Sequence, residues 1–228
     1  MTLDPLWAEI EAEQAWREEE IRALQNMMAT LPTEEERSKF RRTLVVMLYA
    51  HFEGFCKFAF SLYVREVNNA RITCGGATYA IAAASIADVL EALRNPQKKC
   101  DEFRHSLPDD EKLHRFARDR EFIERTTEIE SRIVEIRDDI VDVEDNLKPV
   151  VLRKILYRLG LPHTQFDQIE GQIHQLLNYR NGIAHGSFRD GIPQNRYDGI
   201  YKAVYGIMNT VKREILAAIS ARRFLRAG

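Results

Sequence analysis

The sequence predicts an all-α protein: a bundle of four to five core helices with a charged helical insertion in its middle. Apolar residues recur at three- and four-residue intervals through most of the 228 residues, as on one face of a helix. Capping residues and Pro or Gly breaks divide these runs into segments. Only 11 Gly and 7 Pro occur, too few for a long flexible linker. We therefore expect a single domain over residues 1–228.

Two long helices are expected first. Asp4-Pro5 supplies a cap and a first-turn proline for a helix that runs to about Met28. Thr33-Glu34-Glu35-Glu36 is a capping box for a second helix that runs to about Asn68. The middle of this second helix is apolar on nearly every side. Residues 33–70 are therefore expected to form the central core helix.

The apolar run in this helix approaches membrane-spanning length, but His51, Glu53 and Lys57 interrupt it. Charges at mid-bilayer are costly, so we expect a buried core helix and no membrane partner. The acidic N-terminus does not resemble a signal peptide. Three widely spaced cysteines suggest neither a disulfide framework nor a zinc site, and a cytoplasmic location fits them best.

Residues 75–145 are expected to form a variable insertion that serves partner or substrate choice. Cys74-Gly75-Gly76 breaks the chain before an alanine-rich helix from about Tyr79 to Arg94. Leu107-Pro108 marks a second break. The β-branched residues of 133–143 would suit a strand, but their interleaved charges favour a helix.

Residues 146–225 are expected to hold three further helices. The first opens at Asn146-Leu147-Lys148-Pro149 and ends at Gly160 as a C′ glycine. The second, here called the motif helix, runs from about Gln165 to His185, with Gly186 just past its end. A loop at 190–193 leads to a last helix from about Arg196 to Arg223.

The charge distribution and the absence of common motifs limit the kinds of reaction that the protein could catalyse. The net charge is −2, but residues 1–36 hold ten acids against two arginines, and residues 189–228 hold eight basic residues against three acids. The basic end would either guide a polyanion or form a solvated helix face. No P-loop, GxGxxG, HExxH or GxSxG occurs, and the six histidines lack ligand spacing. We therefore expect no cofactor and no metal.

The remaining candidate is the Arg-x4-His pattern of Arg180 and His185. The spacing alone is weak evidence, because Arg158 and His163 share it across a helix end and a turn. In the motif helix, however, Arg180 continues the apolar stripe of Ile169, Ile173, Leu176 and Ile183, whereas His174, Asn178, Asn181 and His185 form a polar stripe. Five residues place Arg180 and His185 about 140° apart around the helix and about 7.5 Å apart along it.

These residue types suit RNA cleavage without metal. A histidine can serve as acid or base near neutral pH, and an arginine can grip a phosphate with two hydrogen bonds. Asn181 would orient the His185 ring or contact the phosphate, and Glu53 is a candidate partner for an arginine that faces the core. One motif supplies a single histidine, so such a site implies a dimer. Alternatively, His185 favours the helix dipole, Gly186 caps the helix and Arg180 forms a salt bridge at the edge of the core.

The segment from Asn178 to Gly186 resembles the R-N-x-x-x-H-G core of HEPN domains. Leu48-Tyr49-Ala50-His51-Phe52-Glu53-Gly54-Phe55 is similar to the central-helix signature of one bacterial stand-alone branch. The segment from Asp145 to Leu161 is similar to the part of that branch before the motif helix. Order and spacing agree over about residues 40–65 and 145–220.

The resemblance implies a homodimeric, metal-independent endoribonuclease that acts on RNA as a toxin or antiviral-defence effector, with a cognate antitoxin or defence-system partner. It implies Arg180 and His185 as the catalytic pair and Asn181, Asn178 and Glu53 as supporting residues. Phe188 stands where some HEPN toxins have a tyrosine that a partner nucleotidyltransferase modifies, so that form of control is not expected. Some HEPN domains are non-catalytic dimerisation or binding modules of two-component systems, which is the alternative function.

Overall fold

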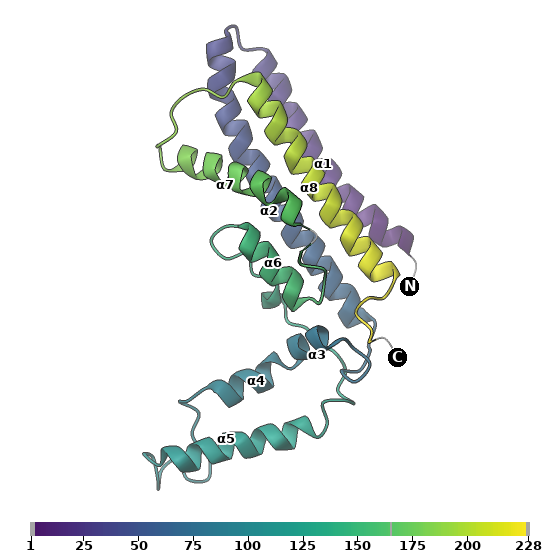
Figure 1. Ribbon diagram of the computed structural model, residues 1–228, viewed down its shortest axis with the longest axis vertical. Helices are drawn as coiled ribbons and strands as arrows, with labels where there is room; N and C mark the ends of the chain where they lie inside the picture. Colours follow the sequence, from purple (N-terminus) through teal and green to yellow (C-terminus); the bar gives the residue numbers. More distant parts are fainter. Residues whose placement is uncertain (1–2, 165, 227–228) are drawn as a thin grey trace.

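The computed structural model describes residues 3–164 and 166–226, and this part of the chain has eight α-helices, two short 3-10 helices and no strand. The all-α prediction is confirmed. Three long helices lie side by side along the molecule (Figure 1): α1, Leu3–Ala29; α2, Glu34–Asn69; and α8, Gln194–Ser220. The shorter α7, Glu170–Ala184, runs across α2 and contacts both α2 and α8. These four helices, with α6 (Pro149–Arg158) against α7, form the bundle.

The central helix α2 begins where its capping box predicts. The Thr33 side chain accepts a hydrogen bond from the Glu36 backbone N–H at 3.2 Å, and the Glu36 carboxylate accepts one from the Thr33 N–H at 3.1 Å. Because α1, α7 and α8 all pack against it, α2 is buried on several sides. It is long and apolar enough to cross a membrane, but 56% of its most apolar window is buried inside the bundle, as in a core helix.

A buried arginine joins α1 to α2. Arg17 donates through Nε to the His51 carbonyl at 3.2 Å and pairs with Glu13 at 2.7 Å. A Cβ added to Gly54 would lie 2.9 Å from Nη2 of Arg17. The Arg17 guanidinium occupies the space that a side chain at residue 54 would need, and glycine leaves this space free.

The inserted segment differs from expectation in two places. The helix expected over 79–94 divides at Ile86 into α3 (Tyr79–Ser85) and α4 (Ala87–Arg94), and the Ser85 hydroxyl accepts a hydrogen bond from the Glu135 N–H at 3.0 Å. The helix expected over 133–143 is wrong. Its start is extended and only Asp138–Ile140 is a short 3-10 helix, because its backbone instead bonds to residues at and beyond the C-terminal end of α2. The helix α5, Glu111–Thr126, packs on α4 and projects with it away from the bundle (Figure 1).

The last third follows the predicted pattern closely. Helix α6 starts at Pro149, and Gly160 follows it with a φ of +66°. The motif helix is α7, preceded by a 3-10 helix at Asp167–Ile169; its expected start at Gln165 lies outside the described residues. Helix α8 ends three residues before the expected Arg223, because the chain turns back there. The Thr78 N–H donates to the Phe224 carbonyl at 2.9 Å, and the Phe224 ring is buried.

Candidate active site

Helix α7 is amphipathic as predicted. Ile173 and Leu176 are buried, and Arg180 on the same stripe is half-buried. On the polar stripe, Asn178 and His185 are exposed and Asn181 is half-buried. The helix therefore holds Arg180 at the edge of the core and His185 in solvent.

Arg180 is held by neutral groups. Its Nη1 donates a hydrogen bond to the Asn181 side-chain oxygen at 2.8 Å. Its guanidinium carbon lies 5.3 Å from the centroid of the Tyr49 ring on α2, within the range of a cation–π contact. Within residues 3–164 and 166–226, no carboxylate oxygen lies within 4.0 Å of the Arg180 nitrogens. The guanidinium is thus positioned without an ion pair.

The expected contact between Glu53 and Arg180 is therefore not formed. The Glu53 carboxylate instead accepts hydrogen bonds from the Tyr49 hydroxyl at 2.6 Å and from the Leu147 backbone N–H at 3.1 Å. The same N–H also reaches the Tyr49 oxygen at 2.9 Å. Glu53 acts on Tyr49, and Tyr49 touches Arg180.

Tyr49 was not among the residues that the motif singled out. It is 3% exposed, and burial, followed by its hydrogen bond to Glu53, raises the pKa of its phenol well above the usual 10. The phenol therefore stays protonated at neutral pH. The available signal was the four-residue step from Tyr49 to Glu53, which places both on one face of α2.

His185 ends the motif helix. Its backbone N–H donates to the Asn181 carbonyl at 2.9 Å, and Gly186 follows with a φ of +74°, as a C-terminal glycine cap requires. Its exposed side chain makes no hydrogen bond to any residue that the structure describes, and the same holds for Asn178. The imidazole is therefore open to a substrate or to a second chain.

The loop after His185 folds back on the last turn of α7. The Phe188 N–H donates to the Gly182 carbonyl at 2.8 Å, and the Phe188 ring packs edge-on against Tyr179 with centroids 5.4 Å apart. A Cβ on Gly182 would lie 3.1 Å from the Phe188 Cβ. The glycine inside the motif therefore allows this close approach.

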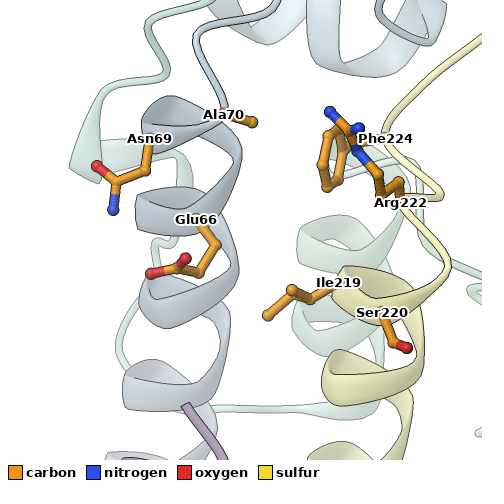
Figure 2. Close-up of a pocket in the computed structure, with 7 residues that line it drawn as sticks. All are labelled: Glu66, Asn69, Ala70, Ile219, Ser220, Arg222 and Phe224. Atoms are coloured by element: carbon orange, nitrogen blue, oxygen red, sulfur yellow. The ribbon is translucent and has the colours of Figure 1, made fainter. Parts of the chain in front are cut away.

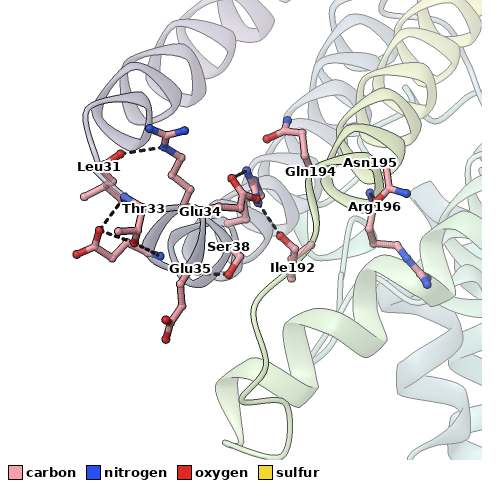
Figure 3. Close-up of polar contacts among 12 residues, drawn as sticks. Leu31, Thr33, Glu34, Glu35, Ser38, Ile192, Gln194, Asn195 and Arg196 are labelled. Atoms are coloured by element: carbon pink, nitrogen blue, oxygen red, sulfur yellow. Dashed lines mark hydrogen bonds and ion pairs between the residues drawn. The ribbon is translucent and has the colours of Figure 1, made fainter.

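The loop is also attached to α2. Arg42 donates to the Arg189 carbonyl at 2.9 Å, and the Ile192 N–H donates to the Ser38 carbonyl at 2.9 Å. The buried Arg41 pairs with Glu34 at 2.7 Å and donates to the Ile192 carbonyl at 3.0 Å. Figure 3 shows Glu34 and Ser38 at the start of α2 beside Ile192, in the segment that enters α8. The loop that follows the motif helix is thus held by residues of α2 that lie 147 and 151 positions earlier in the chain.

The second Arg-x4-His copy has a different structure. Arg158 ends α6, Gly160 turns the chain, and the exposed His163 packs edge-on against Tyr157 with centroids 5.6 Å apart. Arg158 and His163 therefore do not share a helix, whereas Arg180 lies in α7 and His185 is its C-cap residue. This copy provides matched controls for the motif.

The motif does not lie in the pocket of Figure 2. That pocket lies between the C-terminal ends of α2 and α8 and includes Glu66, Ile219 and Phe224. Tyr49 and Glu66 are seventeen residues apart on α2, or roughly 25 Å. In the described part of the chain, no group of three or more His, Cys, Asp or Glu side chains is placed to hold a metal ion.

Three comparisons with known proteins bear on the family of the chain. No curated protein and no solved structure matches the chain in these comparisons. The model of the RiboL-PSP-HEPN family, in contrast, matches residues 12–217, which include α2, α7 and nearly all of α8. A match over this share of the sequence means that the chain belongs to the RiboL-PSP-HEPN family.

Proposed function

We propose that this protein is a metal-independent endoribonuclease whose active site is completed across a homodimer by Arg180 and His185. A HEPN domain suggests a ribonuclease-type or RNA-related function. The observation that carries the finer proposal is the state of the two side chains. Arg180 is positioned by Tyr49 and Asn181 without a carboxylate partner, and His185 is exposed at the end of the same helix.

This arrangement fits cleavage through the ribose 2′-hydroxyl. A base takes the 2′-OH proton, the oxygen attacks the adjacent phosphorus, and an acid protonates the departing 5′-oxygen. His185 can serve as either acid or base, because an imidazole can both donate and accept a proton near neutral pH. A guanidinium without a carboxylate partner can stabilise the charge that develops on the phosphoryl oxygens. The products would be a 2′,3′-cyclic phosphate and a 5′-hydroxyl.

One chain supplies one motif histidine, whereas this reaction uses an acid and a base. A two-fold axis close to the exposed polar stripe of α7 would bring a second His185 to the same phosphate. Two features support this. The stripe is open to solvent in the single chain, and α7 lies crosswise at the edge of the bundle (Figure 1).

The test is cleavage of single-stranded RNA in excess EDTA, with product ends identified by phosphatase and kinase treatment. The wild type and His163→Ala should cut, and His185→Ala should lose at least about a hundredfold in rate, the usual contribution of positioned proton transfer. Arg180→Ala and Arg158→Ala form the second matched pair. Thermal melts verify that each variant is folded. Cleavage by folded His185→Ala at the wild-type rate would refute the assignment.

The same variants address the biological role. If the protein acts as a toxin or defence effector, induced wild type should arrest bacterial growth and His185→Ala should not, at equal protein levels. A partner protein that restores growth would be the antitoxin. A folded dimer that cuts no RNA would instead favour a non-catalytic HEPN module of a two-component system.

A further inference from the structure

We infer that Tyr49 is a positioning residue for this site, which holds the Arg180 guanidinium ready for a phosphate, and that Glu53 acts only through Tyr49. This inference rests on the proposed function for its catalytic consequence, and on the contacts of the helices α2 and α7 and of the loop before α6 for its geometry. The partner of Arg180 is thus the face of the Tyr49 ring, whereas the Glu53 carboxylate was the expected partner.

An arginine that binds a phosphate needs both a fixed orientation and free N–H donors. A carboxylate partner orients a guanidinium, but it also occupies the donors that a phosphate would use. An aromatic face attracts the cation through its quadrupole and leaves the in-plane N–H groups free. Arg180 lies 5.3 Å from the Tyr49 centroid and uses Nη1 on Asn181, so the remaining donors have no partner among the described residues.

Tyr49 is held in place by its surroundings. Its ring is 3% exposed and packs edge-on against Phe52 with centroids 6.3 Å apart. Its hydroxyl donates to Glu53 at 2.6 Å and accepts from the Leu147 N–H at 2.9 Å. Burial and the two hydrogen bonds of its hydroxyl therefore hold the ring in place beside the guanidinium.

Glu53 influences Arg180 through the Tyr49 phenol. A carboxylate that accepts the phenolic hydrogen bond draws the proton outward and increases the electron density of the ring. That strengthens the attraction of the ring for a cation. Glu53 thus reaches Arg180 through the phenol, and the Leu147 N–H that bonds to both oxygens ties this unit to the start of α6.

The first experiment compares Tyr49→Phe with Tyr49→Leu in steady-state RNA cleavage. The phenylalanine variant keeps the face but loses the hydroxyl contacts, so it should lose less kcat than the leucine variant. The leucine variant should lose at least about tenfold in kcat, since small displacements of a catalytic group cost about this much or more. Tyr63→Leu is the control, because Tyr63 is a buried tyrosine on the same helix, fourteen residues away. Equal losses of kcat in Tyr49→Leu and Tyr63→Leu would overturn the inference.

A double-variant cycle separates action through Arg180 from a general effect on packing. In an Arg180→Lys background, Tyr49→Leu should lower kcat much less than it does in the wild type, because the flat guanidinium that the ring orients is gone. Additive losses in the cycle would mean that Tyr49 acts independently of Arg180, contrary to the inference.

A third measurement does not depend on activity. In ¹⁵N-labelled protein, the Arg180 Hε resonance should be displaced by the ring current in the wild type and in Tyr49→Phe, and should return to the free-arginine position in Tyr49→Leu. An unchanged resonance in Tyr49→Leu refutes the contact. If the wild type cuts no RNA but the resonance moves as expected, the nuclease assignment fails while the positioning of Arg180 by Tyr49 stands.

Discussion

Gly191→Ala tests whether the loop after the motif helix is attached to α2 as described. A Cβ at residue 191 would lie 2.1 Å from the Ser38 hydroxyl oxygen, 2.7 Å from its Cβ and 3.1 Å from its backbone carbon. The hydroxyl can rotate, but the Cβ and backbone belong to a core helix. The new methyl group must therefore push the loop and α2 apart.

The expected cost follows from two routes. Overpacking with both segments in place costs about 1–3 kcal/mol. Release of the loop around Ile192 would lose the two hydrogen bonds of its backbone at about 1 kcal/mol each, and would also expose the fully buried Ile192 side chain, worth about 1.5–3 kcal/mol. Overpacking is the less costly route. We expect a loss of about 2 kcal/mol, or about 4–8 °C in Tm for a domain of this size.

The assay is urea unfolding followed by circular dichroism, with Gly206→Ala as the matched control. A Cβ at Gly206 on α8 meets no atom within 4 Å, so this variant should gain about 0.5–1 kcal/mol from helix propensity. Ser38→Gly added to Gly191→Ala should recover part of the loss, since it removes the colliding Cβ. If Gly191→Ala unfolds at the same urea concentration as the wild type, the loop does not pack on Ser38 and the reasoning is refuted.

Two further predictions concern the dimer and the buried His51. If each site needs both histidines, wild type mixed with a tenfold excess of His185→Ala should keep about one eleventh of its activity after subunit exchange. An equal excess of His163→Ala should leave the activity unchanged. Full activity in the mixture with His185→Ala would exclude a shared site. Burial lowers the pKa of His51 from its ordinary 6.5, and this outweighs the Glu20 carboxylate 3.1 Å away. The unfolded chain therefore binds more protons in this range, so the free energy of unfolding should rise from pH 5 to pH 7 and fall as the pH drops below 6.5. The rise should be smaller in His51→Gln, and an equal pH dependence in both proteins would contradict the assignment.

Local chemistry accounts for the parts of the fold that were predicted. The capping box at Thr33, the proline at the start of α6 and the glycines after α6 and α7 act within a few residues, so their consequences can be read from neighbouring positions. The phases of α7 are equally local. An amphipathic repeat places Ile173 inside and His185 outside whatever the helix packs against.

The segment over 133–143 shows where such reasoning fails. Its charges favoured a helix, but the Ile136 N–H bonds to the Asn68 side chain at 2.8 Å, and the Val134 N–H bonds to the Ile72 carbonyl at 2.8 Å. These partners lie more than sixty residues earlier in the chain. Long-range backbone pairing overrode the local preference, as it often does for β-branched residues.

The sequence by itself determined the long helices of the bundle, their order and the placement of Arg180 and His185 on different stripes of one helix, because hydrogen bonds between near neighbours and a 3.6-residue repeat decide these. Only the tertiary structure decided what Arg180 touches. Glu53 was the expected partner as an acid within an apolar helix, but the crossing of α7 over α2 presents the face of Tyr49 to the guanidinium and leaves Glu53 to the phenol and Leu147. That choice depends on how two helices and a loop pack, and packing geometry is not encoded in the spacing of residues along either helix.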